Sequence, residues 1–143
     1  MMWLMAGVFL GIASIWDVKS MRIPIWFLWL GLFSSLVSGA YTIFSGREIW
    51  NQWLAGGIPG GISLLLSLGT REQIGYGDGV VLLTVGWMLG AKAGVLISIL
   101  GLACSFLVSV GVLVCKRGNR STRLPFVPFL MVGYMLVLGG KLL

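Results

Sequence analysis

The chain has 143 residues, of which 58% are hydrophobic and only 10% are charged. A soluble domain of this size has too little polar surface to cover so apolar a composition, so we expect an integral membrane protein. A net charge of +6 is also typical of proteins that bind nucleic acid. However, the basic residues lie in short linkers between apolar runs, where such residues set membrane topology, and we predict no nucleic-acid partner.

The chain contains no histidine. This excludes His-dependent serine and cysteine hydrolases, HExxH zinc sites and imidazole proton shuttles. Cys104 and Cys115 are eleven residues apart within one apolar run, which is too far for a disulfide on one helix. The sequence contains no CxxC pair of the kind that binds zinc. We predict neither a metal nor a cofactor.

Six apolar runs follow one another along the chain, and most approach the roughly 20 residues that a helix needs to cross a bilayer. They cover residues 2–16, 24–44, 49–69, 79–91, 93–115 and 124–140. We predict a single domain over residues 1–143, an all-α membrane protein folded as a bundle of six transmembrane helices. Pro59 lies inside the third run and is expected to kink it.

The basic residues of the linkers indicate the orientation in the membrane. Seven fall in alternate linkers and three in the other linkers and the C-terminus: Lys19, Arg22, Arg71, Lys116, Arg117, Arg120 and Arg123 against Arg47, Lys92 and Lys141. Cytoplasmic loops carry the excess of Lys and Arg. We therefore predict a cytoplasmic-membrane protein with both termini outside and with Asp17 and Asp78 on the cytoplasmic side.

Glycine pairs four residues apart recur in the apolar runs. They are Gly7 with Gly11, Gly56 with Gly60, Gly57 with Gly61, and Gly86 with Gly90. Small residues at this spacing allow membrane helices to approach closely. The pairs predict that the first, third and fourth helices form the inner bundle, although glycine is also common in membrane helices generally.

Two of the four acidic residues, Asp17 and Asp78, lie at the edges of apolar runs. A carboxylate in such a place is costly and is by default functional. The helix before Asp17 measures about 24 Å and the helix after Asp78 about 21 Å, against a hydrocarbon core of about 30 Å. We expect both carboxylates to lie slightly below the cytoplasmic edge of the core, in a recess that water reaches.

Two carboxylates in one partly dry recess share a proton and titrate as a pair. The ionised member can take a proton from water while the protonated member polarises a carbonyl group. The sequence therefore predicts hydrolysis, with Asp17 and Asp78 as the catalytic pair. Gly75 and Gly77 leave the backbone beside Asp78 without side chains, so that an extended substrate can approach closely.

Three segments together resemble the prepilin peptidase family of GxGD-type membrane aspartic proteases. They are Asp17 to Pro24, in which Pro follows Asp by seven residues, Gly75 to Leu83, similar to the family's GxGD-x-K-L-L, and Leu124 to Leu130, similar to its P-F-x-P-F. Within and beside these motifs we expect six residues to bind substrate or shape the site: Gly75, Tyr76, Gly77, Gly79, Pro24 and Lys19.

The resemblance implies a multi-pass endopeptidase of the cytoplasmic membrane. Such an enzyme removes the short basic leader of type IV prepilin-like proteins by cutting after a glycine on the cytoplasmic side, and by position Asp17 and Asp78 are its catalytic aspartates. No region with paired CxxC motifs precedes the first run, so the chain resembles the short, core-only branch of the family. The partners it implies are the lipid bilayer and prepilin-like substrates, and it implies no particular oligomeric state.

Two alternatives belong to other classes. One is a subunit of a proton-coupled transporter, because membrane carboxylates also serve as proton relays; it predicts acids nearer the middle of the membrane. The other is a catalytically silent assembly partner. It is favoured by two departures from the family pattern, Ile25 in place of the usual Asn or Asp and Val80 in place of the usual Lys.

Overall fold

The computed structural model describes residues 2–46, 50–69, 75–115 and 124–142, which contain six helices and no strand. The helices are α1 (Met2–Ser20), α2 (Ile25–Phe44), α3 (Trp50–Gly56), α4 (Ile58–Gly69), α5 (Tyr76–Val114) and α6 (Val127–Leu142). Three of them, α1, α2 and α5, are long and apolar enough to cross a membrane, and α4 and most of α6 are shorter apolar helices. The all-α class is confirmed for the described residues, while six membrane crossings stay a prediction.

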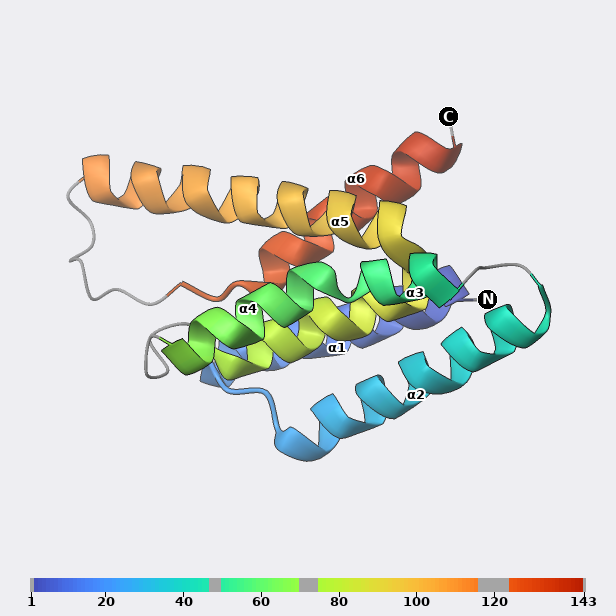
Figure 1. Cartoon of the computed structure of the whole chain (residues 1–143). Coiled ribbons are helices and arrows are strands. Elements are labelled where there is room, and N and C mark those ends of the chain that lie inside the picture. The colour runs from blue at the N-terminus through green and yellow to red at the C-terminus, as the bar shows by residue number, and fades with distance from the viewer. Residues whose placement is uncertain (1, 47–49, 70–74, 116–123, 143) are drawn as a thin grey trace.

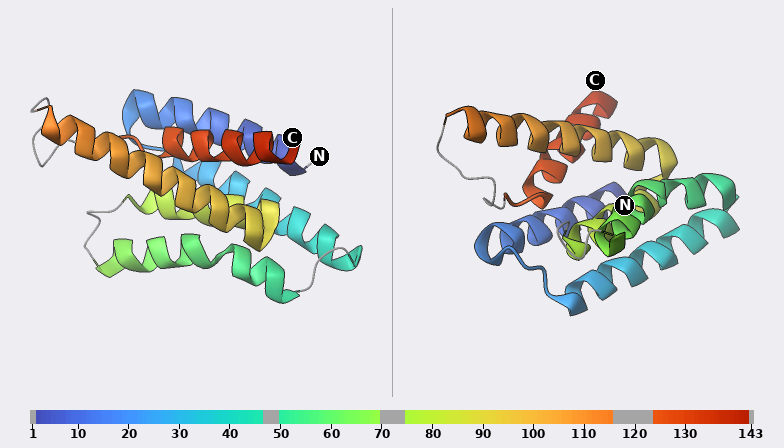
Figure 2. Two further views of the ribbon diagram at one scale, coloured as in Figure 1. Left: turned by 90° about the horizontal axis from the view of Figure 1, so that it is seen from above. Right: turned by 60° about the vertical axis from the view of Figure 1, so that its left-hand side comes forward.

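Helix α5 consists of two arms that run in opposite directions (Figures 1 and 2). As a straight helix its 39 residues would measure about 58 Å, far more than the bilayer core. At Gly90, φ is 80° and ψ is 171°, a conformation that residues with a Cβ rarely adopt. The first arm (76–89) and the second arm (91–114) correspond to the fourth and fifth predicted runs, and one glycine rather than a linker reverses the chain between them.

The third predicted run is divided into two helices. Helix α3 ends at Gly56 and α4 begins at Ile58. Pro59 has no N–H to donate to the carbonyl group four residues earlier, and its ring clashes with that carbonyl in a regular helix. The break confirms the kink expected at Pro59.

Glycines bring α3 and α4 against the backbone of the first arm of α5. A methyl group added at Gly56 would lie 2.4 Å from the carbonyl oxygen of Gly86, and one added at Gly60 would lie 2.3 Å from the backbone nitrogen of Leu83. In lipid, such close packing is a main source of helix association. The first arm is therefore the centre of the bundle, and α5 contacts each of the other five helices.

The glycines of α1 face α6. A methyl group added at Gly7 would lie 2.9 Å from the hydroxyl oxygen of Tyr134, and one added at Gly11 would lie 3.9 Å from Met131. Both neighbours belong to α6. Of the three helices predicted to form the inner bundle, the third and fourth pack together through their glycines, whereas the glycines of α1 lie on the face that receives the larger side chains of α6.

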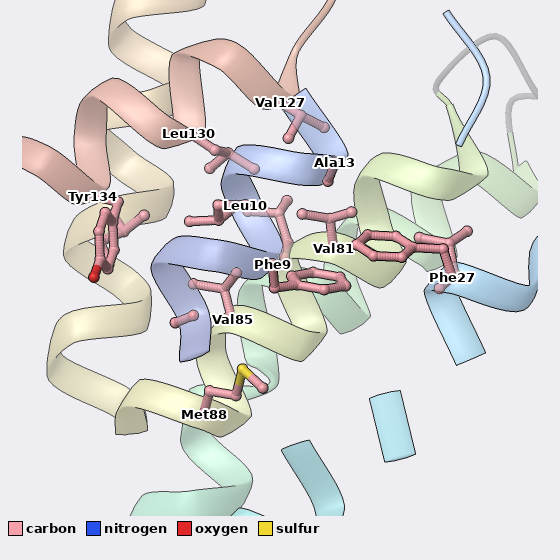
Figure 3. Packing of buried hydrophobic residues seen from close by; sticks show 14 residues of the cluster. Phe9, Leu10, Ala13, Phe27, Val81, Val85, Met88, Val127, Leu130 and Tyr134 are labelled. Atoms are coloured by element: carbon pink, nitrogen blue, oxygen red, sulfur yellow. The ribbon is translucent and has the colours of Figure 1, made fainter. Parts of the chain in front are cut away.

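The hydrophobic core lies between α1, the two arms of α5, α6 and the start of α2 (Figure 3). Phe9 of α1 stacks on Phe27 of α2 with ring centroids 4.9 Å apart, and the hydroxyl group of Tyr134 donates to the carbonyl of Trp3. Many large apolar side chains remain exposed on the outer faces of the helices. This distribution suits a bundle whose outer surface meets lipid.

The described basic residues are separated along the bundle. Lys19 lies in the last turn of α1 and Lys92 follows the reversal of α5, and these two places are at opposite ends (Figure 1). Arg22 follows α1 in the short turn to α2. The membrane orientation stays a prediction, because the other basic residues on which it rests lie outside the described residues. They are Arg47, Arg71, Lys116, Arg117, Arg120, Arg123 and, for its side chain, Lys141.

We expect Gly86→Ala to destabilise the bundle by about 1–3 kcal/mol, as overpacking does. The added methyl group would lie 1.9 Å from the carbonyl oxygen of Gly56, and backbone atoms have little room to move away. Gly61→Ala is the matched control, because nothing lies within 4 Å of its added methyl group and alanine suits a helix better than glycine. Thermal unfolding in detergent measures both, and equal stability of the two variants would contradict this packing.

Candidate functional site

Asp17 lies on the buried face of α1. Ala6, Leu10 and Ala13 precede it at intervals of four and three residues, and all three are 0% exposed. Residues at this spacing share one face of a helix, so the Asp17 side chain, only 6% exposed, points into the bundle. Helix α1 continues to Ser20, so Asp17 is held within the helix rather than in the turn that follows.

The start of α6 binds the Asp17 carboxylate. The backbone N–H of Val127 donates to Asp17 Oδ2 at 2.9 Å, and the backbone of Phe126 interacts with the same carboxylate. Val127 is the first residue of α6 and is fully buried. The first N–H groups of a helix have no acceptor within it, so Asp17 caps α6 from a position 110 residues earlier in the chain.

Asp78 lies in the first turn of α5 and is half-buried. Its backbone N–H donates to the carbonyl of Gly75 at 3.1 Å, in the turn that begins the helix. Its carboxylate is close enough to that of Asp17 for the two charges to repel each other. In the part of the chain that the structure describes, no group donates a hydrogen bond to the Asp78 carboxylate.

The two glycines before Asp78 have different surroundings. A methyl group at Gly75 would lie 3.0 Å from Asp78 Oδ2, so this glycine leaves room for the carboxylate itself. A methyl group at Gly77 would lie 3.9 Å from Leu28 and 4.0 Å from Ile23, at an ordinary contact distance. Gly77 therefore faces the start of α2, and Gly75 faces the candidate site.

The other predicted site residues have separate environments. Gly79 is buried, and a methyl group there would lie 2.9 Å from Leu64 of α4. Pro24 is half-buried before α2, and its carbonyl accepts the N–H of Phe27 at 3.0 Å. Lys19 and Tyr76 are exposed, and within the described ranges neither forms an ion pair or hydrogen bond with a carboxylate. The structure thus groups Asp17, Asp78 and Gly75, and it leaves Lys19 and Tyr76 on the surface.

Sequence reasoning missed the amide of Val127. The segment from Leu124 to Leu130 contributed only to the family resemblance and had no predicted contact. A signal was present in the sequence, because Pro128 near the start of the last apolar run is typical of the first turn of a helix, whose N–H groups need acceptors from outside the helix. In the structure the N–H of Val127 finds its acceptor in Asp17, and the backbone of Phe126 interacts with the same carboxylate.

An all-helical bundle with apolar outer faces and two neighbouring carboxylates at one end defines a helical membrane protein with a candidate acid pair. The family model described as the type IV leader peptidase family matches residues 4–115. The match covers most of the chain and includes Asp17 and Asp78, and the chain belongs to the type IV leader peptidase family. The family resemblance is thereby confirmed, although the match ends before α6. No curated protein and no solved structure matches the chain.

Two substitutions at Asp17 are expected to distinguish its role as the hydrogen-bond acceptor at the start of α6 from the role of its negative charge. Asp17→Asn keeps an oxygen that accepts the N–H of Val127, whereas Asp17→Ala leaves that buried N–H without an acceptor, at a cost of about 1–3 kcal/mol. We therefore expect the Asn variant to be the more stable of the two by roughly this amount in unfolding experiments in detergent. Equal stability of the two variants would show that the hydrogen bond to Val127 does not support the fold.

Proposed function

We propose that the chain is a membrane aspartic endopeptidase that removes the leader peptide of type IV prepilin-like proteins. Asp17 and Asp78 are the pair that activates water. The proposal is carried by the proximity of these two carboxylates, which come from different helices, in a member of the type IV leader peptidase family. The sequence contains no histidine, so no Ser–His or Cys–His system competes for the role.

The chemistry needs one carboxylate ionised and the other protonated. The ionised member takes a proton from a water molecule, whose oxygen attacks the scissile carbonyl carbon. The protonated member gives its proton to the carbonyl oxygen, so that an uncharged tetrahedral diol forms. The diol collapses when the proton taken from water passes to the leaving nitrogen, the C–N bond breaks, and a hydroxyl proton returns to the other carboxylate.

The position of the pair suits a substrate anchored in the membrane. Asp17 lies near the end of α1 and Asp78 at the beginning of α5, so both are at one end of the bundle and not midway along it. A prepilin-like protein would keep its apolar segment in the bilayer beside the helices and its leader in the cytoplasm. The scissile bond after glycine then lies at the membrane surface, where water and the carboxylates meet.

The alternatives receive less support. A proton-coupled transporter predicts carboxylates near the middle of the membrane, whereas both aspartates lie at helix ends. A silent partner is suggested by the two apolar departures, yet Ile25 is 71% exposed and Val80 packs against the hydrophobic core. Neither apolar side chain occupies the place of a carboxylate of the proposed pair.

We expect the wild-type protein to shorten a co-expressed prepilin-like substrate, as seen by a shift in gel mobility. Asp17→Asn and Asp78→Asn should each slow this cleavage by at least about 10²-fold, because each removes a proton-transfer group. A transporter would lose proton flux and not cleavage, and a silent partner would show no cleavage even in the wild type. Cleavage that survives either substitution would end the aspartic mechanism.

A matched control for the loss of one carboxylate is Glu48→Gln. Glu48 is another of the four acidic residues and lies between α2 and α3 in the sequence. This variant should cleave as the wild type does. Each variant is first shown to be inserted in the membrane fraction and monodisperse in detergent, so that a lost gel shift reports on chemistry.

A further inference from the structure

The two carboxylates of the candidate pair have unequal environments. Asp17 is buried and accepts a hydrogen bond from the backbone of Val127 at 2.9 Å. Asp78 is half-buried, and within the described residues its carboxylate accepts no hydrogen bond. A hydrogen bond donated to a carboxylate favours its charged form. The inequality therefore decides which of the two keeps the negative charge.

We propose that the backbone amide of Val127 is a positioning group that holds Asp17 in its ionised form, so that Asp17 is the base and Asp78 begins the reaction as the acid. This assignment rests on the proposed function. In it, the water proton passes to Asp17, and the proton of Asp78 passes to the scissile carbonyl oxygen. The proton on Asp17 then passes to the leaving nitrogen, and the carboxyl group of Asp78 is restored from the hydroxyl group.

The proton is placed by the difference in hydrogen bonding, since other effects act on both residues. Two neighbouring carboxylates do not readily ionise together, so one of them retains a proton. Burial disfavours charge on each. Asp78 lies in the first turn of α5 and Asp17 lies against the first turn of α6, and the N-terminal end of a helix favours an anion. The direct N–H donor acts on Asp17 alone.

The charged groups around Asp17 do not replace the amide. From α5 the titratable group that faces Asp17 is Asp78, which repels it. The start of α6 presents Phe126 and Val127, whose side chains are apolar and whose backbone groups both interact with Asp17. Lys19 on α1 and Arg22 in the following turn are exposed, and in the described part of the chain neither forms an ion pair with Asp17.

The sequence of α6 reserves this donor for Asp17. Pro128 contributes no N–H, and the N–H groups of Phe129 and Leu130 donate to the carbonyl of Phe126 at 3.0 and 3.3 Å. Val127 is 0% exposed, so water does not reach its amide. A buried backbone N–H without an acceptor is rare in proteins, and Asp17 supplies the acceptor here.

The test is the pH dependence of kcat/KM for leader cleavage by the full-length protein. Val127→Pro removes the N–H at the first helical position, where proline is tolerated. We expect the acidic limb of the profile to move to higher pH by about one to two units, since a hydrogen bond to a charged group is lost. Val127→Ala keeps the N–H, so its acidic limb should stay in the wild-type position even if poorer packing lowers the rate.

The outcomes separate the two proposals. A wild type that cuts no leader counts against the proposed function. If the wild type cuts and Val127→Pro moves only the basic limb upward, Asp17 is the acid, and this assignment is overturned while the proposed function stands. If neither the acidic nor the basic limb of the pH profile moves in Val127→Pro, the Val127 amide does not position or ionise Asp17. If Val127→Pro fails to insert, the α-hydroxy analogue of valine at position 127, which replaces the amide by an ester, removes the same N–H and decides between these results.

Discussion

The hydrogen bond between the Val127 amide and the Asp17 carboxylate joins two helices that are 110 residues apart in sequence. A buried backbone N–H without an acceptor and a buried, isolated carboxylate are each costly, because water does not reach them. Each of these groups meets the need of the other. The same contact fixes the start of α6 and holds Asp17 against the end of the bundle where α5 begins, so the geometry of the candidate pair depends on it.

Close glycine contacts bring Asp78 to the same place. Gly56 and Gly60 pack on the first arm of α5, and Gly79, next to Asp78, packs on Leu64 of α4. In lipid, close van der Waals packing of this kind drives helix association, because the hydrophobic effect does not act between helices there. While α3 and α4 pack on the first arm, α6 packs on the second arm, where Gly133 lies against Ile97 and Gly101 lies against Leu130. Packing along α5 thus fixes the position of Asp78 relative to the other helices.

The site is assembled from helix ends. The last turns of α1 and the first turns of α5 and α6 meet there, and the N-terminal ends of two helices favour negative charge. Among the residues that the structure describes, no basic side chain pairs with either acid of this partly buried pair, and Lys19 and Arg22 are exposed. Such a setting suits proton transfer between water and a peptide bond at a membrane surface. A basic partner would instead hold both aspartates ionised.

The sequence alone determined the helical class, the apolar runs, the break near Pro59 and the choice of Asp17 and Asp78 as candidate residues. These features follow from local properties, namely composition, run length, the missing N–H of proline and the cost of a charge beside an apolar run. Only the tertiary structure decided that Gly90 reverses the chain within one helix, that the glycines of α1 face α6, and that the acceptor of the Val127 N–H is Asp17. Each of these is a property of two segments in contact, and the spacing of residues within one segment carries no information about which distant segment meets it.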